Sequence, residues 1–188
     1  MRLNPNIKTS ELIVPIKPKF KLLLMLPFAI GLTLLAITFY QAEQPPILQI
    51  NELISDNKSS LATKQGLHKD WLELINNSQQ PLNLEQFYLS DKAYKQQPLP
   101  SIELKPGEIV LLWADGKPEL GKNHLSFKLS KRGEILYLWH NSEQQEPELI
   151  QTLPLPPLAA DISYALIAGQ YQKCLTPSPN RANSCTEQ

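Results

Sequence analysis

The chain has 188 residues, which is enough for one globular domain and a short appendage. Hydrophobic residues make up 42% of it, an ordinary share for a protein that buries a core. The 17 prolines outnumber the 7 glycines, and many separate apolar runs, which favours a loop-rich β domain and argues against a helical bundle.

The formal net charge of zero conceals an uneven distribution. Residues 1–21 carry five basic side chains and one acidic side chain, residues 22–40 carry no charge, and the remainder carries 13 basic and 17 acidic side chains. A basic leader, an uncharged run and an acidic domain in that order are typical of a membrane boundary. The acidic domain lacks the basic stripe that phosphate contacts need, so nucleic acid is not an expected partner.

The uncharged run, residues 22–40, predicts one transmembrane helix, because 19 helical residues at about 1.5 Å each cover roughly the 30 Å hydrocarbon core. The positive-inside rule makes residues 1–21 a cytoplasmic basic tail of an integral inner-membrane protein and places the rest in the periplasm or outside the cell. A cleaved signal peptide is the main alternative, although its apolar region is normally shorter and the positions around Tyr40 and Ala42 offer no clean cleavage site. A buried core helix is a third interpretation.

Residues 41–46 predict a short linker stiffened by Pro45 and Pro46, and residues 47–170 predict a single all-β domain. No apolar repeat of helical period continues beyond about two turns after residue 47. Short strand-like runs separated by turn residues occur instead, at residues 47–54, 71–76, 87–90, 101–104, 108–113, 125–128, 134–139, 149–153 and 162–165. Such a series predicts a β-sandwich or a barrel.

Side-chain alternation predicts which faces of these strands are buried. The continuous apolar run at residues 109–113 is typical of a central strand covered on both faces. Leu72 and Leu74 should face the core, which turns Trp71 and Glu73 to the other side. We therefore consider Trp71 and Glu73 a candidate partner-binding surface, because an exposed tryptophan can anchor a partner. The alternative is that Trp71 packs beneath a loop.

Cys174 and Cys185 are the only cysteines, and both lie in a proline-rich C-terminal tail, residues 171–188. In an oxidising compartment they should form a disulfide, and the alternative is two free thiols. Two cysteines without further nearby ligands do not make a zinc site.

Five acidic residues fall at strand ends and turns, namely Glu52, Asp56, Asp70, Glu73 and Asp91. They could converge on a calcium or magnesium ion or serve as turn caps, and capping is the preferred interpretation. No nucleophile with a positioned base and no metal-ligand cluster is evident. We expect no catalytic residues, no cofactor, no metal and no enzymatic activity.

Short motifs in a fixed order resemble the lamin tail domain family. They are Ile50-Asn51-Glu52-Leu53, Asp70-Trp71-Leu72-Glu73-Leu74, Phe87-Tyr88-Leu89-Ser90-Asp91, Leu104-Lys105-Pro106-Gly107-Glu108, Ala114-Asp115-Gly116, Gly133-Glu134-Ile135-Leu136-Tyr137-Leu138 and Asp161-Ile162-Ser163-Tyr164. Each motif is weak alone, but the ordered series covers residues 47–165. The resemblance implies an immunoglobulin-like β-sandwich that binds or scaffolds and carries out no reaction.

These observations together predict a membrane-tethered, non-catalytic module that displays a lamin-tail-like domain outside the cytoplasm. Its partner would be a protein or an envelope polymer. The alternative function is that of an accessory subunit of a separately encoded exported nuclease or hydrolase, because the family is often joined to such enzymes in bacteria.

Overall fold

The computed structural model describes residues 45–94, 97–142 and 146–185. The predicted transmembrane helix at residues 22–40 and the basic tail before it lie outside the described residues. Within the described ranges, no helix is long and apolar enough to cross a bilayer. Residues 45–188 form a unit of their own, and the architecture below concerns that unit.

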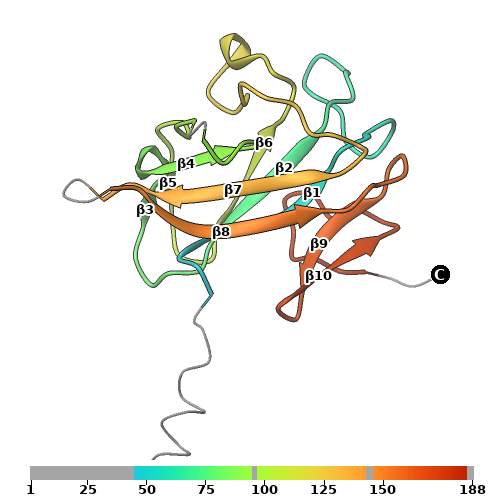
Figure 1. Ribbon diagram of the computed structural model, residues 1–188. Coiled ribbons are helices and arrows are strands. Elements are labelled where there is room, and N and C mark those ends of the chain that lie inside the picture. The colour runs from blue at the N-terminus through green and yellow to red at the C-terminus, as the bar shows by residue number, and fades with distance from the viewer. Residues whose placement is uncertain (1–44, 95–96, 143–145, 186–188) are drawn as a thin grey trace, which may run out of the picture. The chain divides into compact units, whose positions relative to one another are not determined.

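The described part of the domain consists of ten strands and two short 3-10 helices, which confirms the all-β prediction (Figure 1). In chain order they are β1 (Leu48–Ile54), β2 (Trp71–Asn76), β3 (Leu82–Asn83), η1 (Leu84–Gln86), β4 (Phe87–Ser90), β5 (Glu103–Leu104), β6 (Ile109–Trp113), η2 (Pro118–Leu120), β7 (Glu134–His140), β8 (Glu148–Leu155), β9 (Ser163–Ile167) and β10 (Gln170–Cys174).

A five-stranded sheet in the order β10-β9-β1-β2-β6 packs against a three-stranded sheet in the order β4-β7-β8. All pairings between the named strands are antiparallel, and the strands β3 and β5 form a small separate pair. Figure 1 shows β7 and β8 lying in front of the larger sheet. The main core joins both sheets through fully buried leucines, among them Leu72, Leu74, Leu112, Leu89, Leu136 and Leu138. The domain is therefore a β-sandwich.

A bulge in β1 changes which of its side chains face the core. The pairing register with β2 shifts between Ile50 and Glu52, so Asn51 is the extra residue. Ile50 and Leu53 both lie in the main core although they are three positions apart. As a result Asn51 and Glu52 both turn to the outer face of the five-stranded sheet, which matters for the site described below.

The prediction that residues 109–113 form a central strand is wrong, because β6 is an edge of the five-stranded sheet. The edge is nevertheless covered. The Trp113 backbone donates to Asn123 O at 2.7 Å, and Leu125 donates to Trp113 O at 2.8 Å. The loop after η2 thus takes the place of a further strand beside Trp113. The strand is apolar on both faces because Val110 and Leu112 lie in the main core while Leu111 packs with Ile54 and Trp71 on the other side.

Two other differences concern the end of the chain and one loop. The predicted strand at residues 125–128 is not formed, although Leu125 and Phe127 are buried in the main core. The strand β10 was not predicted, because its sequence (QYQKC) is polar and lacks alternation, as suits an exposed edge. Since β10 pairs with β9, the boundary at residue 170 was also wrong and the sandwich continues to Cys174.

Candidate functional site

The predicted partner-binding surface at Trp71 and Glu73 is not a surface. Both side chains face away from the main core, as the alternation predicted, but both are 0% exposed. Trp71 packs with Ile54 and Leu111 in a second small cluster, against which the partly buried Leu61 also lies. The alternative interpretation, that Trp71 lies beneath a loop, is the one that the structure supports.

Glu73 is covered by the segment 175–185, which we call the C-terminal clasp. The backbone N–H of Asn180 donates to one Glu73 oxygen, and Asn51 Nδ2 donates to the other at 3.2 Å. Burial is the main reason why the pKa of Glu73 rises from 4.5 to about 7, and the nearby Glu52 adds to the rise. A buried carboxylate with only neutral donors around it is a packing element of the fold and offers no open site.

The neighbouring carboxylate, Glu52, holds the clasp more directly. It accepts from the Ser178 backbone N–H at 3.0 Å and from Ser178 Oγ at 2.9 Å, and Ser163 Oγ donates to it at 2.6 Å. Glu52 and Glu73 are cross-strand partners in β1 and β2, so one stretch of the tail covers both. Hydrogen bonds from the clasp to these two carboxyl groups thereby seal the outer face of the sheet.

Two further links close the clasp. The side-chain amides of Asn51 and Asn183 exchange hydrogen bonds at 3.1 and 3.0 Å, and Asn183 Nδ2 also reaches Leu166 O at 3.1 Å. Cys174 and Cys185 are joined by a disulfide across 11 residues, as predicted. Cys174 belongs to β10, so the bridge ties the end of the chain to the edge strand of the sheet.

Of the three remaining predicted acidic residues, Asp91 lies partly buried in a bend directly after β4, and Asp56 and Asp70 are partners in turns. Asp56 lies 3.0 Å from Lys58 Nζ, and Asp70 accepts from the Asn57 backbone at 3.0 Å. The turn acceptor Asp161 was missed, although its hydrogen bond from Ser59 Oγ lowers its pKa to about 2. In the described ranges no group of three or more His, Cys, Asp or Glu residues is placed to hold a metal ion.

An open site lies at one end of the sandwich. Pairing places Ile54, Trp71 and Trp113 side by side at this end, while Leu48 and Asn76 pair at the other. The loops that follow β1 and β6 meet here, and we call it the loop end. Figure 1 shows these loops, with η2, above the strands.

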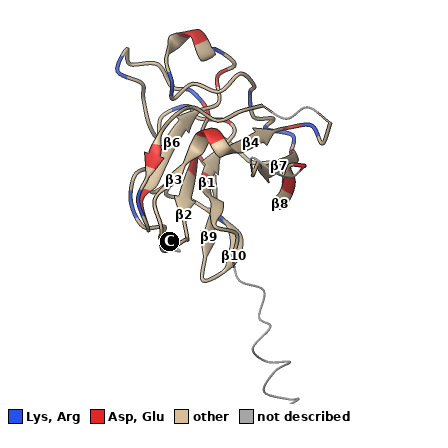
Figure 2. Ribbon diagram, turned by 90° about the vertical axis from the view of Figure 1, so that its left-hand side faces the viewer, with Lys and Arg blue, Asp and Glu red and all other residues tan. Residues whose placement is uncertain are grey.

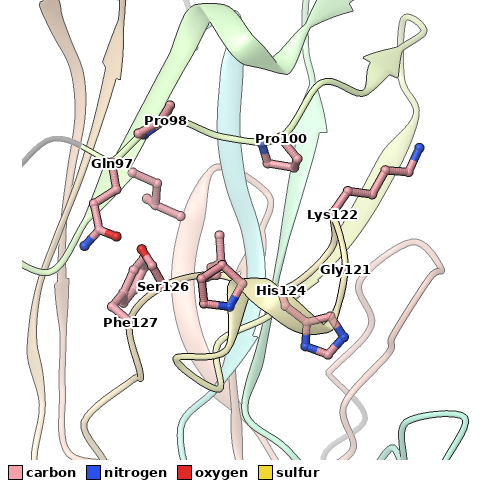
Figure 3. Close-up of a pocket in the computed structure, with 11 residues that line it drawn as sticks. Gln97, Pro98, Pro100, Gly121, Lys122, His124, Ser126 and Phe127 are labelled. Atoms are coloured by element: carbon pink, nitrogen blue, oxygen red, sulfur yellow. The ribbon is translucent and has the colours of Figure 1, made fainter.

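Two adjoining hollows at the loop end form what we call the loop-end groove. The first, about 190 Å³, is mainly apolar and is lined by Leu89, Gln97, Pro98, Pro100, Pro118, Gly121, Lys122, His124, Leu125, Ser126 and Phe127 (Figure 3). The second, about 300 Å³, is more polar and is lined by Thr63, Lys64, Gln65, Trp113, Leu120, Gly121, Lys122, Asn123 and His124. Gly121, Lys122 and His124 line both hollows, so we call the segment 121–124 the ridge between them.

The groove is cationic although the domain as a whole is acidic. No Asp or Glu is among its described lining residues, whereas Lys64 and Lys122 both line it and are exposed. Figure 2 shows basic segments among the loops around η2, and the acidic residue of η2 itself, Glu119, does not line either hollow. Neither lysine forms an ion pair with a described residue. An anionic group could therefore approach them without displacing another acid.

His124 is held in a fixed orientation beneath the ridge. Its Nδ1 lies 3.0 Å from Asp115 Oδ2, and the side chains are 15% and 3% exposed. Asp115 also accepts from the Lys117 backbone at 3.1 Å, which fixes the carboxylate in turn. This pair shapes the wall of the groove. Sequence reasoning missed the groove because its walls come from separate segments of the chain, chiefly residues 63–65, 97–100 and 118–127.

An antiparallel two-sheet sandwich of short strands is the immunoglobulin-like class of fold. A model of the lamin tail domain family matches residues 41–153, more than half of the chain. The chain belongs to the lamin tail domain family. The match ends within β8, so β9, β10 and the C-terminal clasp lie beyond it. Comparisons with curated proteins and with solved structures give no match.

Proposed function

We propose that this chain is a membrane-tethered, non-catalytic binding module that displays its lamin tail domain outside the cytoplasm and docks a protein or an envelope polymer there. The observation that carries the binding role is the loop-end groove. It joins an apolar hollow to a polar one, and a few placed polar groups beside an apolar floor are the usual composition of a binding site.

Two observations support the location. The charge changes from a basic leader through an uncharged run of 19 residues to an acidic domain, which favours an anchor with the N-terminus inside. The Cys174–Cys185 disulfide is of the kind that persists in oxidising compartments. Both features agree with a domain that works outside the cytoplasm.

The location is tested with two reporters fused after Gln188 of the full chain. An enzyme that is active only after export should be active, and a fluorescent protein that folds only in the cytoplasm should stay dark. Carbonate washing should leave the fusion in the membrane fraction. The reverse reporter pattern would contradict the proposal, and a released form that lacks the residues before Ala42 would show a cleaved signal in place of an anchor.

The absence of catalysis is tested on the purified full chain. Nucleic acid, peptide and ester substrates should remain intact with and without added Mg²⁺, Ca²⁺ or Zn²⁺. Metal-dependent turnover that disappears in an Asp70→Ala variant would contradict the non-catalytic part of the proposal.

A further inference from the structure

The size of the apolar hollow in the loop-end groove restricts what can enter it. Its volume of about 190 Å³ is too small for a drug-sized ligand, since such sites range from about 300 to 1,000 Å³. An apolar cavity of about 150 Å³ is known to accept benzene. The hollow between the three prolines and Phe127 therefore fits one aromatic or large aliphatic side chain.

The charge of the groove restricts the rest of the ligand. Beside the hollow, Lys64 and Lys122 line the polar part, and no described acidic residue does. A ligand that spans both parts needs an apolar group next to negative charge. Anionic polysaccharides supply the charge but no large apolar side group, whereas a peptide with acidic residues and one aromatic residue supplies both.

We propose that the loop-end groove binds an extended acidic segment of a partner protein, which places one aromatic or large aliphatic side chain in the apolar hollow and carboxylates beside Lys64 and Lys122. This inference rests on the proposed binding function and names the class of partner. Specificity comes from the hollow, and the lysines add affinity and accelerate the encounter.

The test uses the full chain in nanodiscs of zwitterionic lipid and four fluorescent nonapeptides, with binding measured by anisotropy. The first peptide is acidic with a central Phe, the second has Ala in place of that Phe, the third has Gln in place of the acids, and the fourth has Lys in their place. The first should bind at least about fivefold more tightly than each of the others, and its affinity should fall as salt is raised.

Two groove variants separate the contributions. Lys64→Gln with Lys122→Gln should weaken binding of the acidic Phe peptide about tenfold and reduce its salt dependence. Ser126→Trp, at an exposed position that lines the hollow, should fill it and abolish the preference for Phe over Ala. The matched control, Lys92→Gln with Lys105→Gln, removes two exposed lysines outside the groove and should leave binding unchanged.

Equal binding of all four peptides, or equal binding by the groove variants and the control, would overturn the inference. So would binding of polygalacturonate or of anionic-lipid nanodiscs through Lys64 and Lys122 without binding of the acidic Phe peptide. The exported location in the proposed function is tested independently of peptide binding, by the reporters fused after Gln188. Peptide binding with a cytoplasmic reporter would refute only the location, and an exported reporter without peptide preference would refute only this partner.

Discussion

The clasp-covered face of the five-stranded sheet and the loop-end groove are both polar regions of one small domain, but they are built differently. On the covered face, Glu52 and Glu73 are fully buried, and each accepts hydrogen bonds from clasp residues more than 100 positions away. In the groove, Lys64 and Lys122 are exposed and unpaired among the described residues, and prolines form much of the wall.

The difference shows that buried polarity here serves stability and exposed polarity is available for recognition. A buried carboxylate is retained only where donors satisfy it, so its loss leaves those donors unpaired. An exposed lysine on a rim contributes little to folding. Substitutions on the covered face should therefore change the free energy of unfolding, whereas substitutions in the groove should change binding alone.

The largest effect should come from Glu52→Ala. The change leaves Ser163 Oγ and both donors of Ser178 without their acceptor, and we expect the free energy of unfolding to fall by about 4 kcal/mol. Urea denaturation measures it. Glu103→Ala, at an exposed position in β5, is the control and should change stability by less than about 0.5 kcal/mol. Equal effects of the two would mean that the clasp does not stabilise the sheet.

The second effect concerns the disulfide. Replacing Cys174 and Cys185 together by serine removes a constraint on a loop of 11 residues and should destabilise by about 2–3 kcal/mol in the loop-entropy model. The loss should be accompanied by faster hydrogen exchange at Ser178 and Asn180, because the clasp then opens before the sandwich unfolds. Unchanged exchange at these amides would show that the Glu52 and Glu73 contacts hold the clasp without the disulfide.

The third effect is a dependence of stability on pH. Glu73 titrates near 4.5 in the unfolded chain and at about 7 in the fold, so the unfolded chain binds fewer protons between these values. Stability should therefore be highest near pH 4.5 and fall by up to about 3 kcal/mol as the pH rises to 7. Burial also raises the pKa values of Asp70 and Glu134, which adds a smaller fall of the same sign.

Glu73→Gln should remove most of this slope, and Glu103→Gln should leave it intact. Melting temperatures measured at half-unit steps of pH between 4.5 and 7.5 provide the comparison. Below pH 4 the sign reverses, because the lowered pKa of Asp161 contributes stability that is lost as the pH falls toward 2. A slope in Glu73→Gln equal to that of the parent would contradict the assignment to this residue.

The smallest effect should be found in the groove. Lys64→Gln with Lys122→Gln should leave the free energy of unfolding within about 0.5 kcal/mol of the parent, because both side chains are exposed and neither is in an ion pair with a described residue. A larger loss of unfolding free energy would show that the groove lysines stabilise the fold, as the buried carboxyl groups of the covered face do.

Much of the sandwich could be predicted from local pattern. The strands β2 and β4 were predicted with the bounds that the structure has, since alternation and turn residues mark them clearly. The assignment of Leu72 and Leu74 to the core was also confirmed. The ordered motifs indicated the family that the family model then matched. These features depend on residues close together in the sequence.

The errors concern contacts that local pattern does not encode. Alternation placed Trp71 and Glu73 on the outer face correctly, but it could not show that residues near position 180 return to cover Glu73. The sequence gives one indication of the bulge at Asn51. The apolar residues Ile50 and Leu53 are three positions apart, whereas regular alternation would place them two or four apart. The groove has no signature in either wall alone, because Pro98 and Phe127 line the same hollow only in the folded domain.

The position of β1 between β2 and β9 has a consequence for how the domain is made. The strand β1 is the first of the described strands to be synthesised, but Ser163 of β9 follows Glu52 by 111 residues, so one edge of β1 stays unpaired until β9 has been made. Such late pairing makes folding slow, and an open apolar edge can pair with another nascent chain. The domain can therefore complete its fold only after β9 has been synthesised, and a protein truncated before residue 163 should accumulate as aggregates.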